Sequence, residues 1–177
     1  MTRINSVFAA LLSSAVVLGC GGSNANPPAG ATAKSGSSGP ASTAPVESCT
    51  LLSQAEIAEL TGNPVEKGQP FAGPEVCKWA AEPNRTSVLL TVRLAGSERE
   101  KVLCSELRKG GGEGERVEGV GDVAIWKFSS TMGLFNSGEL ETCGTKGYLN
   151  VSLNGKPAES QLKQTSIAIV RKVLQRL

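Results

Sequence analysis

The feature that most constrains this chain is a short apolar segment near its start that ends on a cysteine. Residues 7–18 (VFAALLSSAVVL) are largely apolar, Arg3 precedes them, and Gly19 and Cys20 follow. A membrane-spanning helix needs about 20 apolar residues, so this run is too short to cross a bilayer. Its length and its flanks are typical of a signal peptide. We therefore expect residues 1–19 to direct export, and the remaining chain to fold in an oxidising compartment.

The end of this segment resembles the lipobox of bacterial lipoproteins. Val17, Leu18 and the small Gly19 precede Cys20, and the resemblance implies a diacylglyceryl group on the Cys20 sulfur and cleavage after Gly19. The competing interpretation is an ordinary secretory signal in which the cysteine occurs by chance. Gly21 follows, so no acidic residue stands there to favour retention at an inner membrane. We expect the lipid on Cys20 to anchor the chain to the cell membrane or an outer membrane, with the domain on the extracytoplasmic side.

The next segment has the composition of a linker. Residues 21–45 consist mainly of Gly, Ser, Ala, Pro and Thr, and Lys34 is their only charged residue. They contain no large apolar side chain, so they cannot bury enough surface to offset the entropy lost on ordering. We therefore expect residues 20–46 to form the lipidated cysteine and a flexible stalk. The remaining residues, 47–177, are enough for one domain.

Four cysteines remain after Cys20, and they predict two disulfides. An even number of cysteines in an exported domain favours paired thiols over free ones. Three pairings are possible, and we prefer Cys49–Cys77 with Cys104–Cys143 because each ties a helix to the sheet that follows it. The competing interpretation is a four-cysteine zinc site, but no Cys-x-x-Cys pair is present. We expect no metal and no cofactor.

Helices are predicted at three places by start signals and apolar spacing. Ser53 and Glu56 have the spacing of a capping box, which predicts a helix over residues 54–61. Ser97 and Glu100 have the same spacing, and the helix that they open runs to about Arg108. The third helix follows Pro157. Its predicted apolar stripe consists of Leu162, Ser166, Ile169, Val170, Val173, Leu174 and Leu177.

Strands are predicted from alternating apolar residues. In residues 148–153, Leu149, Val151 and Leu153 should face the core, while Tyr148 should point outward. A hairpin is expected within residues 132–143, turning at residues 136–138. The other predicted strands are residues 76–81, 87–94 and 122–128. The order of helices and strands predicts an α+β domain in which an antiparallel sheet packs with about three helices.

Four short motifs of this domain resemble one known family. They are CTLLSQAE at residues 49–56, LTG at 60–62, CKW at 77–79 and GVGDVA at 119–124. This pattern is similar to that of the small, mainly actinobacterial envelope lipoproteins called domain of unknown function 3558. The resemblance covers most of residues 49–177. It implies export, membrane anchoring and a compact α+β fold, and it implies no catalytic residue. The chain departs from the family pattern in its additional pair, Cys104 and Cys143.

The composition argues against several functions. The chain has no His, which removes the usual general base and the commonest metal ligand, and a cysteine nucleophile would lack its usual base. Of the 18 Lys and Arg residues, Arg3 and Lys34 lie before residue 46, so residues 46–177 carry 16 basic and 16 acidic side chains. Such a neutral domain gives no reason to expect nucleic-acid binding. The glycine run at 110–114 lacks the Lys-Ser/Thr of a phosphate loop, and we interpret it as a connector.

A few side chains remain as candidates for a site. Glu139 and Glu141 share one face of a predicted strand, where paired carboxylates can serve acid–base chemistry or bind calcium. Charges on an exposed strand are the simpler interpretation. Trp79 and Trp126 should lie in the core, because the chain is poor in aromatic residues. Tyr148, if it points outward, is a candidate contact residue.

These observations support two functional hypotheses, and neither is an enzyme. The first is a noncatalytic, membrane-anchored envelope lipoprotein that acts as an interaction module. The second is a receptor or carrier for a small apolar or lipid-like ligand held between sheet and helix. A large cavity beside Trp79 or Trp126 would favour the receptor, whereas a filled core with an exposed apolar patch would favour the interaction module.

Overall fold

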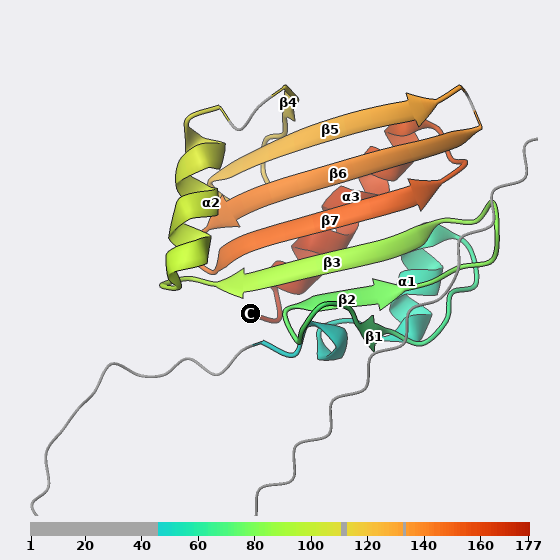
Figure 1. The fold of residues 1–177 in the computed structure, drawn as a ribbon, viewed down its shortest axis with the longest axis horizontal. Helices are drawn as coiled ribbons and strands as arrows, with labels where there is room; N and C mark the ends of the chain where they lie inside the picture. Colours follow the sequence, from blue (N-terminus) through green and yellow to red (C-terminus); the bar gives the residue numbers. More distant parts are fainter. Residues whose placement is uncertain (1–45, 111–112, 133) are drawn as a thin grey trace, which may run out of the picture. The chain divides into compact units, whose positions relative to one another are not determined.

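The computed structural model describes residues 46–110, 113–132 and 134–177. These residues form one α+β domain, in which a seven-stranded antiparallel sheet packs with three α-helices (Figure 1). The predicted fold class is therefore confirmed. The predicted signal peptide, Cys20 and residues 21–45 of the predicted stalk lie outside the described residues.

The sheet has the order β1-β2-β3-β7-β6-β5-β4. Its strands are β1 (Gln69–Pro70), β2 (Val76–Trp79), β3 (Ser87–Leu94), β4 (Glu115–Arg116), β5 (Val123–Thr131), β6 (Phe135–Gly144) and β7 (Gly147–Gly155). Strands that are adjacent in the sheet are also consecutive in the chain, except that β3 pairs with β7. Both edge strands are only two residues long, which limits the backbone that they expose for pairing.

The helices lie on both faces of the sheet. They are the 3-10 helix η1 (Ser48–Thr50) and the α-helices α1 (Gln54–Thr61), α2 (Glu98–Arg108) and α3 (Glu159–Leu174). The long helix α3 crosses one face, and α2 covers one end of the other face (Figure 1). The two faces consequently have separate apolar clusters, a large one that includes α1 and α3 and a small one beneath α2.

Strand periodicity explains which side chains enter the larger cluster. Leu149, Val151 and Leu153 of β7 are each at most 1% exposed, and the neighbouring strands add residues of the same phase. The predicted stripe of α3 packs on this surface. Its buried members are Leu162, Ser166, Ile169, Val170 and Val173, while Leu174 and Leu177 are half-buried. The stripe is therefore confirmed for its first five residues.

The helix starts are formed largely as their capping residues predict. Ser53 Oγ accepts a hydrogen bond from the Glu56 amide, and the Ser53 amide donates to the Glu56 carboxylate, which completes the capping box of α1. At α2, Ser97 Oγ accepts from the Glu100 amide at 3.1 Å, but the Glu100 carboxylate accepts from the Gly96 amide instead of the Ser97 amide. The second capping box is therefore only half formed.

The preferred disulfide pairing is confirmed. Cys49 is bonded to Cys77 with 5.0 Å between their Cα atoms, and Cys104 is bonded to Cys143 with 5.6 Å. The first bond joins the segment before α1 to β2, and the second joins α2 to β6. Each bond therefore holds a helical segment against the sheet, as the pairing argument expects.

The turn predicted at residues 136–138 is wrong. Strand β6 runs without interruption from Phe135 to Gly144, and the chain reverses earlier, where the Leu134 amide donates to the Thr131 carbonyl at 2.9 Å. Gly138 instead lies in the middle of β6, opposite Phe128. A β-carbon at Gly138 would overlap the ring of Trp126, so this glycine is required by packing and not by a turn.

The prediction that Tyr148 points outward is also wrong. It lies on the sheet face opposite α3, as its alternation requires, but α2 covers that part of the face. Tyr148 is consequently only 5% exposed. Strand alternation assigns a residue to a face, and whether that face meets solvent depends on the distant helix that packs on it.

Candidate functional site

The two tryptophans are buried in the packed core of the described domain. Trp79 and Trp126 are at most 2% exposed, and both belong to the larger apolar cluster. Each ring packs against a glycine: a β-carbon at Gly68 would lie 2.7 Å from Trp79 Nε1, and one at Gly138 would overlap the Trp126 ring. Four pockets at the surface of the described residues are all lined by other side chains.

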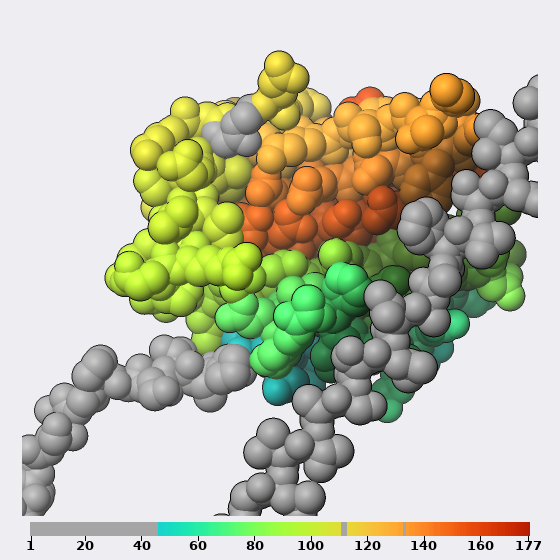
Figure 2. All heavy atoms as spheres, in the orientation of Figure 1, coloured from blue at the N-terminus to red at the C-terminus, as the bar shows by residue number. Residues whose placement is uncertain are grey.

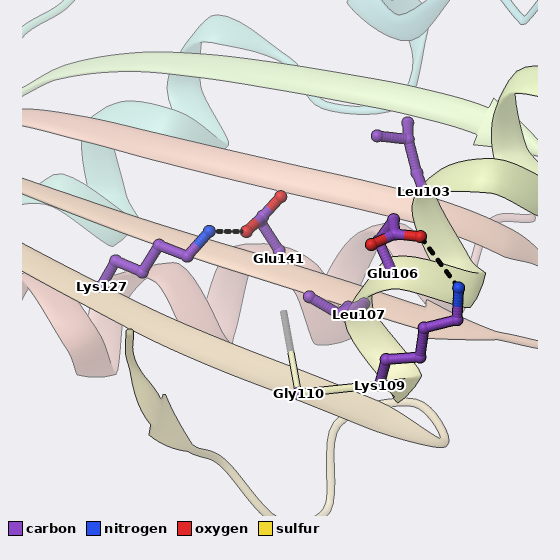
Figure 3. Close-up of a pocket in the computed structure, with 7 residues that line it drawn as sticks. All are labelled: Leu103, Glu106, Leu107, Lys109, Gly110, Lys127 and Glu141. Atoms are coloured by element: carbon purple, nitrogen blue, oxygen red, sulfur yellow. Dashed lines mark hydrogen bonds and ion pairs between the residues drawn. The ribbon is translucent and has the colours of Figure 1, made fainter. Parts of the chain in front are cut away.

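A polar pocket lies between α2 and the sheet. It has a volume of about 540 Å³, and its walls come from the C-terminal half of α2 and from strands β5 and β6 (Figure 3). Leu103 and Leu107 supply its apolar surface. The remaining lining residues are Glu106, Lys109, Gly110, Lys127 and Glu141. The four charged groups are two cations and two anions, so the pocket has no excess of one charge.

The charged groups of this pocket are paired with one another. Lys127 Nζ contacts Glu141 Oε2, and Lys109 Nζ contacts Glu106 Oε1 at 3.1 Å (Figure 3). Tyr148 Oη donates to the other Glu141 oxygen at 2.8 Å. Burial, and then this hydrogen bond, raise the pKa of the Tyr148 hydroxyl well above its usual range. Glu141 is thus an acceptor that is already satisfied, which suits a structural role better than that of a base.

The predicted neighbours Glu139 and Glu141 do share one face of β6. They contact different partners, because Asn150 Nδ2 donates to Glu139 at 2.5 Å whereas Glu141 contacts Lys127 and Tyr148. These paired polar side chains can hold the strands together and can present a polar surface. In residues 46–110, 113–132 and 134–177, no three His, Cys, Asp or Glu side chains are arranged to hold a metal ion.

The second candidate is an apolar tip on the β5–β6 hairpin. We define the hairpin tip as Phe128, Met132, Leu134 and Phe135, which are respectively 37%, 93%, 70% and 44% exposed. These four include most of the large apolar side chains that the described domain leaves in solvent; the others are Phe71 and Val102. Their position at one end of a hairpin makes the tip a candidate contact surface.

The hairpin tip projects beyond its neighbouring strands. The last residue of β7, Gly155, pairs with Asn136, so Phe135 and the turn extend past β7. On its outer edge, away from β6, β5 pairs with β4 only at Ile125 and Trp126. The rest of this outer edge has no strand beside it in the described part of the chain. The tip therefore lies at the end of the sheet away from α2 (Figure 1, and the upper right of the domain in Figure 2).

Apolar side chains lie on both faces of this hairpin. Phe128 pairs with Gly138 and has the phase of Trp126, so it points to the α3 face. Phe135 has the phase of Ser137 and Glu139, so it points to the opposite face. Met132 and Leu134 flank the turn between them. The tip is thus apolar on both sides and at its end.

Charged residues are absent from the whole tip segment. Residues 128–138 (FSSTMGLFNSG) contain no Asp, Glu, Lys or Arg, although these make up 19% of the chain. Lys127 and Glu139 bound the segment and lie opposite each other on paired strands. This uncharged run with four large apolar residues is the sequence signal that could have identified the tip. The predicted turn position concealed it, because it placed Met132, Leu134 and Phe135 within a strand and not at the turn.

Comparisons with protein-family models, with curated proteins and with solved structures found no match. In the described ranges, no helix combines the length and apolar composition needed to cross a membrane. The candidate site therefore depends on the geometry of this chain alone, and the hairpin tip is the feature that stands out.

Proposed function

We propose that this protein is a membrane-anchored lipoprotein of the cell envelope that acts without catalysis as an interaction module. The anchor is the lipid expected on Cys20, and the contact surface is the hairpin tip. The proposal combines the lipobox-like end of the signal segment with the packing of the domain. The resemblance to domain of unknown function 3558 implies the same anchoring and so supports the proposal.

One observation favours the interaction module over the receptor. The core is filled around both tryptophans, while Met132 and Leu134 are left 93% and 70% exposed at the end of a hairpin. A receptor for an apolar molecule needs an enclosed apolar site, whereas the pocket beside α2 is lined by paired charges. The exposed apolar tip is what an interaction module requires.

The anchor is tested by replacing the cysteine. Cys20→Ala should release the chain from the membrane fraction or leave the precursor uncut, and mass spectrometry of the wild-type protein should find an acylated N-terminal Cys20. A mature chain that starts elsewhere and carries no lipid would refute the anchor.

The contact surface is tested by crosslinking in cells. A photoreactive amino acid at Met132 should capture a neighbouring molecule, whereas the same group at Val102 should capture little. Val102 is the matched control, since it is 61% exposed but lies on α2 at the other end of the sheet. Equal capture at both positions would mean that the tip is not a preferred contact surface.

A further inference from the structure

The arrangement of the hairpin tip restricts what can cover it. A protein partner normally covers one side of a strand pair, but Phe128 and Phe135 point to opposite faces, and Met132 and Leu134 extend past the last pair of β5 and β6. A flat partner surface would leave at least one of these side chains in water. A fluid layer that surrounds the end of the hairpin covers all four at once.

We propose that the hairpin tip enters the interfacial layer of the same membrane that holds the chain through Cys20. This inference rests on the proposed function and names the partner of its contact surface as a lipid surface. The tip then supplies a second, shallow membrane contact, and it fixes the orientation of a domain that the anchor alone would leave free to rotate.

The polar residues behind the tip match the depth of such a contact. Ser129, Ser130, Thr131, Asn136 and Ser137 lie between the turn and the first charged residues of the two strands, Lys127 and Glu139, and none of them is charged. The three steps from Phe128 to Thr131 span about 10 Å at the rise of a strand, and interfacial segments enter a bilayer by about 5–10 Å. The first charges therefore stay in the aqueous headgroup region.

Backbone hydrogen bonding also favours a shallow position. The inner edges of β5 and β6 pair with each other as far as Thr131 and Phe135, and the turn is closed by the bond from the Leu134 amide to the Thr131 carbonyl. The outer edge of β5 beyond Trp126 has no strand partner in the described residues. Unpaired backbone groups are costly in hydrocarbon but are satisfied among headgroups and water. The hairpin is thus built to touch the interface and not to span the bilayer.

The chain between the anchor and the domain is long enough for this contact. The 26 steps from Cys20 to Val46 correspond to at most about 90 Å of extended chain. Seven strands spaced about 4.8 Å apart make a sheet about 30 Å wide. The tip can therefore reach the membrane that holds Cys20 from any side of the domain.

The test uses the full-length protein purified from membranes, with one added thiol as a reporter. Met132→Cys carries an environment-sensitive fluorophore at the tip, and Val102→Cys carries the same fluorophore as the matched control. Both positions are exposed, so neither change disturbs the core, and the domain's own cysteines are bonded in pairs. Each protein is incorporated into vesicles of phosphatidylethanolamine and phosphatidylglycerol that carry bromine near the headgroup end of their acyl chains.

We expect the brominated lipid to quench position 132 roughly twofold and to leave position 102 unchanged, as shallow insertion of the tip requires. Adding Leu134→Asp to the Met132→Cys protein should abolish most of the quenching. Equal and weak quenching at both positions would overturn the inference. The inference would also be overturned if position 132 were covered in cells but exposed to water in vesicles, because a protein would then cover the tip.

The same samples separate this inference from the proposed anchor. Mass spectrometry reports whether Cys20 carries lipid and, where it does not, whether its thiol has taken up the fluorophore, so that only protein labelled at the added thiol alone is compared. A lipidated protein with an unquenched tip refutes the inference and leaves the anchor intact. A quenched tip on a protein without lipid, mixed with the same vesicles, supports the inference and refutes the anchor. A protein that has no lipid and no quenching refutes both.

Discussion

The fold strongly affects the protonation of Tyr148. This residue lies beneath α2, and its hydroxyl donates to Glu141 at 2.8 Å. Burial is the larger cause of its raised pKa, and the bond to the carboxylate is the second. Because the pKa is higher in the folded state, the protonated hydroxyl stabilises the fold. That contribution is fully present below the unfolded pKa of about 10 and is lost as the pH rises through the folded value.

This chain has a single tyrosine, so the shift can be measured directly. We expect no tyrosinate absorbance as the folded protein is titrated through pH 10, whereas the protein unfolded in urea should titrate near that value. Glu141→Gln should lower the folded pKa part of the way, because it removes the carboxylate and leaves the burial. A tyrosinate signal near pH 10 in the folded protein would show that Tyr148 is in contact with water.

Gly138 predicts a second effect at the scale of one residue. A β-carbon there would overlap the ring of Trp126, which is 2% exposed and cannot move into solvent. We expect Gly138→Ala to lower the free energy of unfolding by about 1–3 kcal/mol, as overpacking of a core does. Urea unfolding followed by tryptophan fluorescence measures this loss. Ser137→Ala is the control, since Ser137 lies on the opposite face, and an equal loss there would exclude ring contact as the cause.

At the scale of helices and strands, Glu56 connects two helices that are distant in the chain. It completes the capping box of α1 with Ser53, and its carboxylate also contacts Lys172 of α3 at 3.0 Å and Arg176 just after α3. The hydrogen bond with Arg176, followed by those with Ser53 and Lys172, holds the pKa of Glu56 well below its usual value of 4.5. The ionised carboxylate therefore stabilises the fold above that value, and the contribution is lost as the pH falls below it.

We expect Glu56→Gln to lower the urea midpoint at pH 7, and the difference from the wild type to shrink as the pH falls below about 4. Gln keeps a similar shape but loses the charge. Glu59→Gln on the same helix is the control, since Glu59 is exposed and should change the midpoint little. A difference that stays constant from neutral to acidic pH would show that the charge of Glu56 does not cause the effect.

Helices and strands were predictable wherever the signal is local. Ser53 and Glu56 mark the start of α1 through bonds to the adjacent backbone, and alternation identifies β3 with its observed bounds, Ser87–Leu94. The β5–β6 turn was not predictable in this way. Gly138 is a residue typical of turns, but here it is required because the ring of a tryptophan on the neighbouring strand leaves no room for a β-carbon. Such a contact is visible only once the register of the strands is known. The exposed hairpin tip was missed for the same reason.

At the scale of the whole molecule, the two disulfides act on opposite faces of the sheet. Cys77 belongs to the cluster that contains α3, whereas Cys104 and Cys143 belong to the cluster beneath α2. The number and pairing of these bonds could be predicted from the sequence, because four cysteines allow only three pairings and each preferred pair ties a helix to the sheet that follows it. Their division between two faces could not, since it depends on α2 crossing to the face that α3 leaves open.

The Cys104–Cys143 disulfide should contribute most to the attachment of α2, because the apolar cluster beneath this helix is small. Its loop of 39 residues predicts a loss of about 4 kcal/mol when Cys104→Ala and Cys143→Ala are combined. Urea unfolding of the double variant measures this loss, and α2 should then exchange its amide hydrogens faster than α3. The matching pair Cys49→Ala and Cys77→Ala should leave exchange in α2 unchanged. Similar exchange in α2 with and without its disulfide would contradict this account.

The strand order has a consequence for how the chain is made. The middle strand of the sheet is β7, and it is also the last strand in the chain. Until residues 147–155 have emerged, β3 and β6 each lack one neighbouring strand. Synthesis from the N-terminus therefore leaves two incomplete half-sheets that only the final segment can join. Long-range pairing of this kind closes slowly, which suits the export across a membrane that we propose.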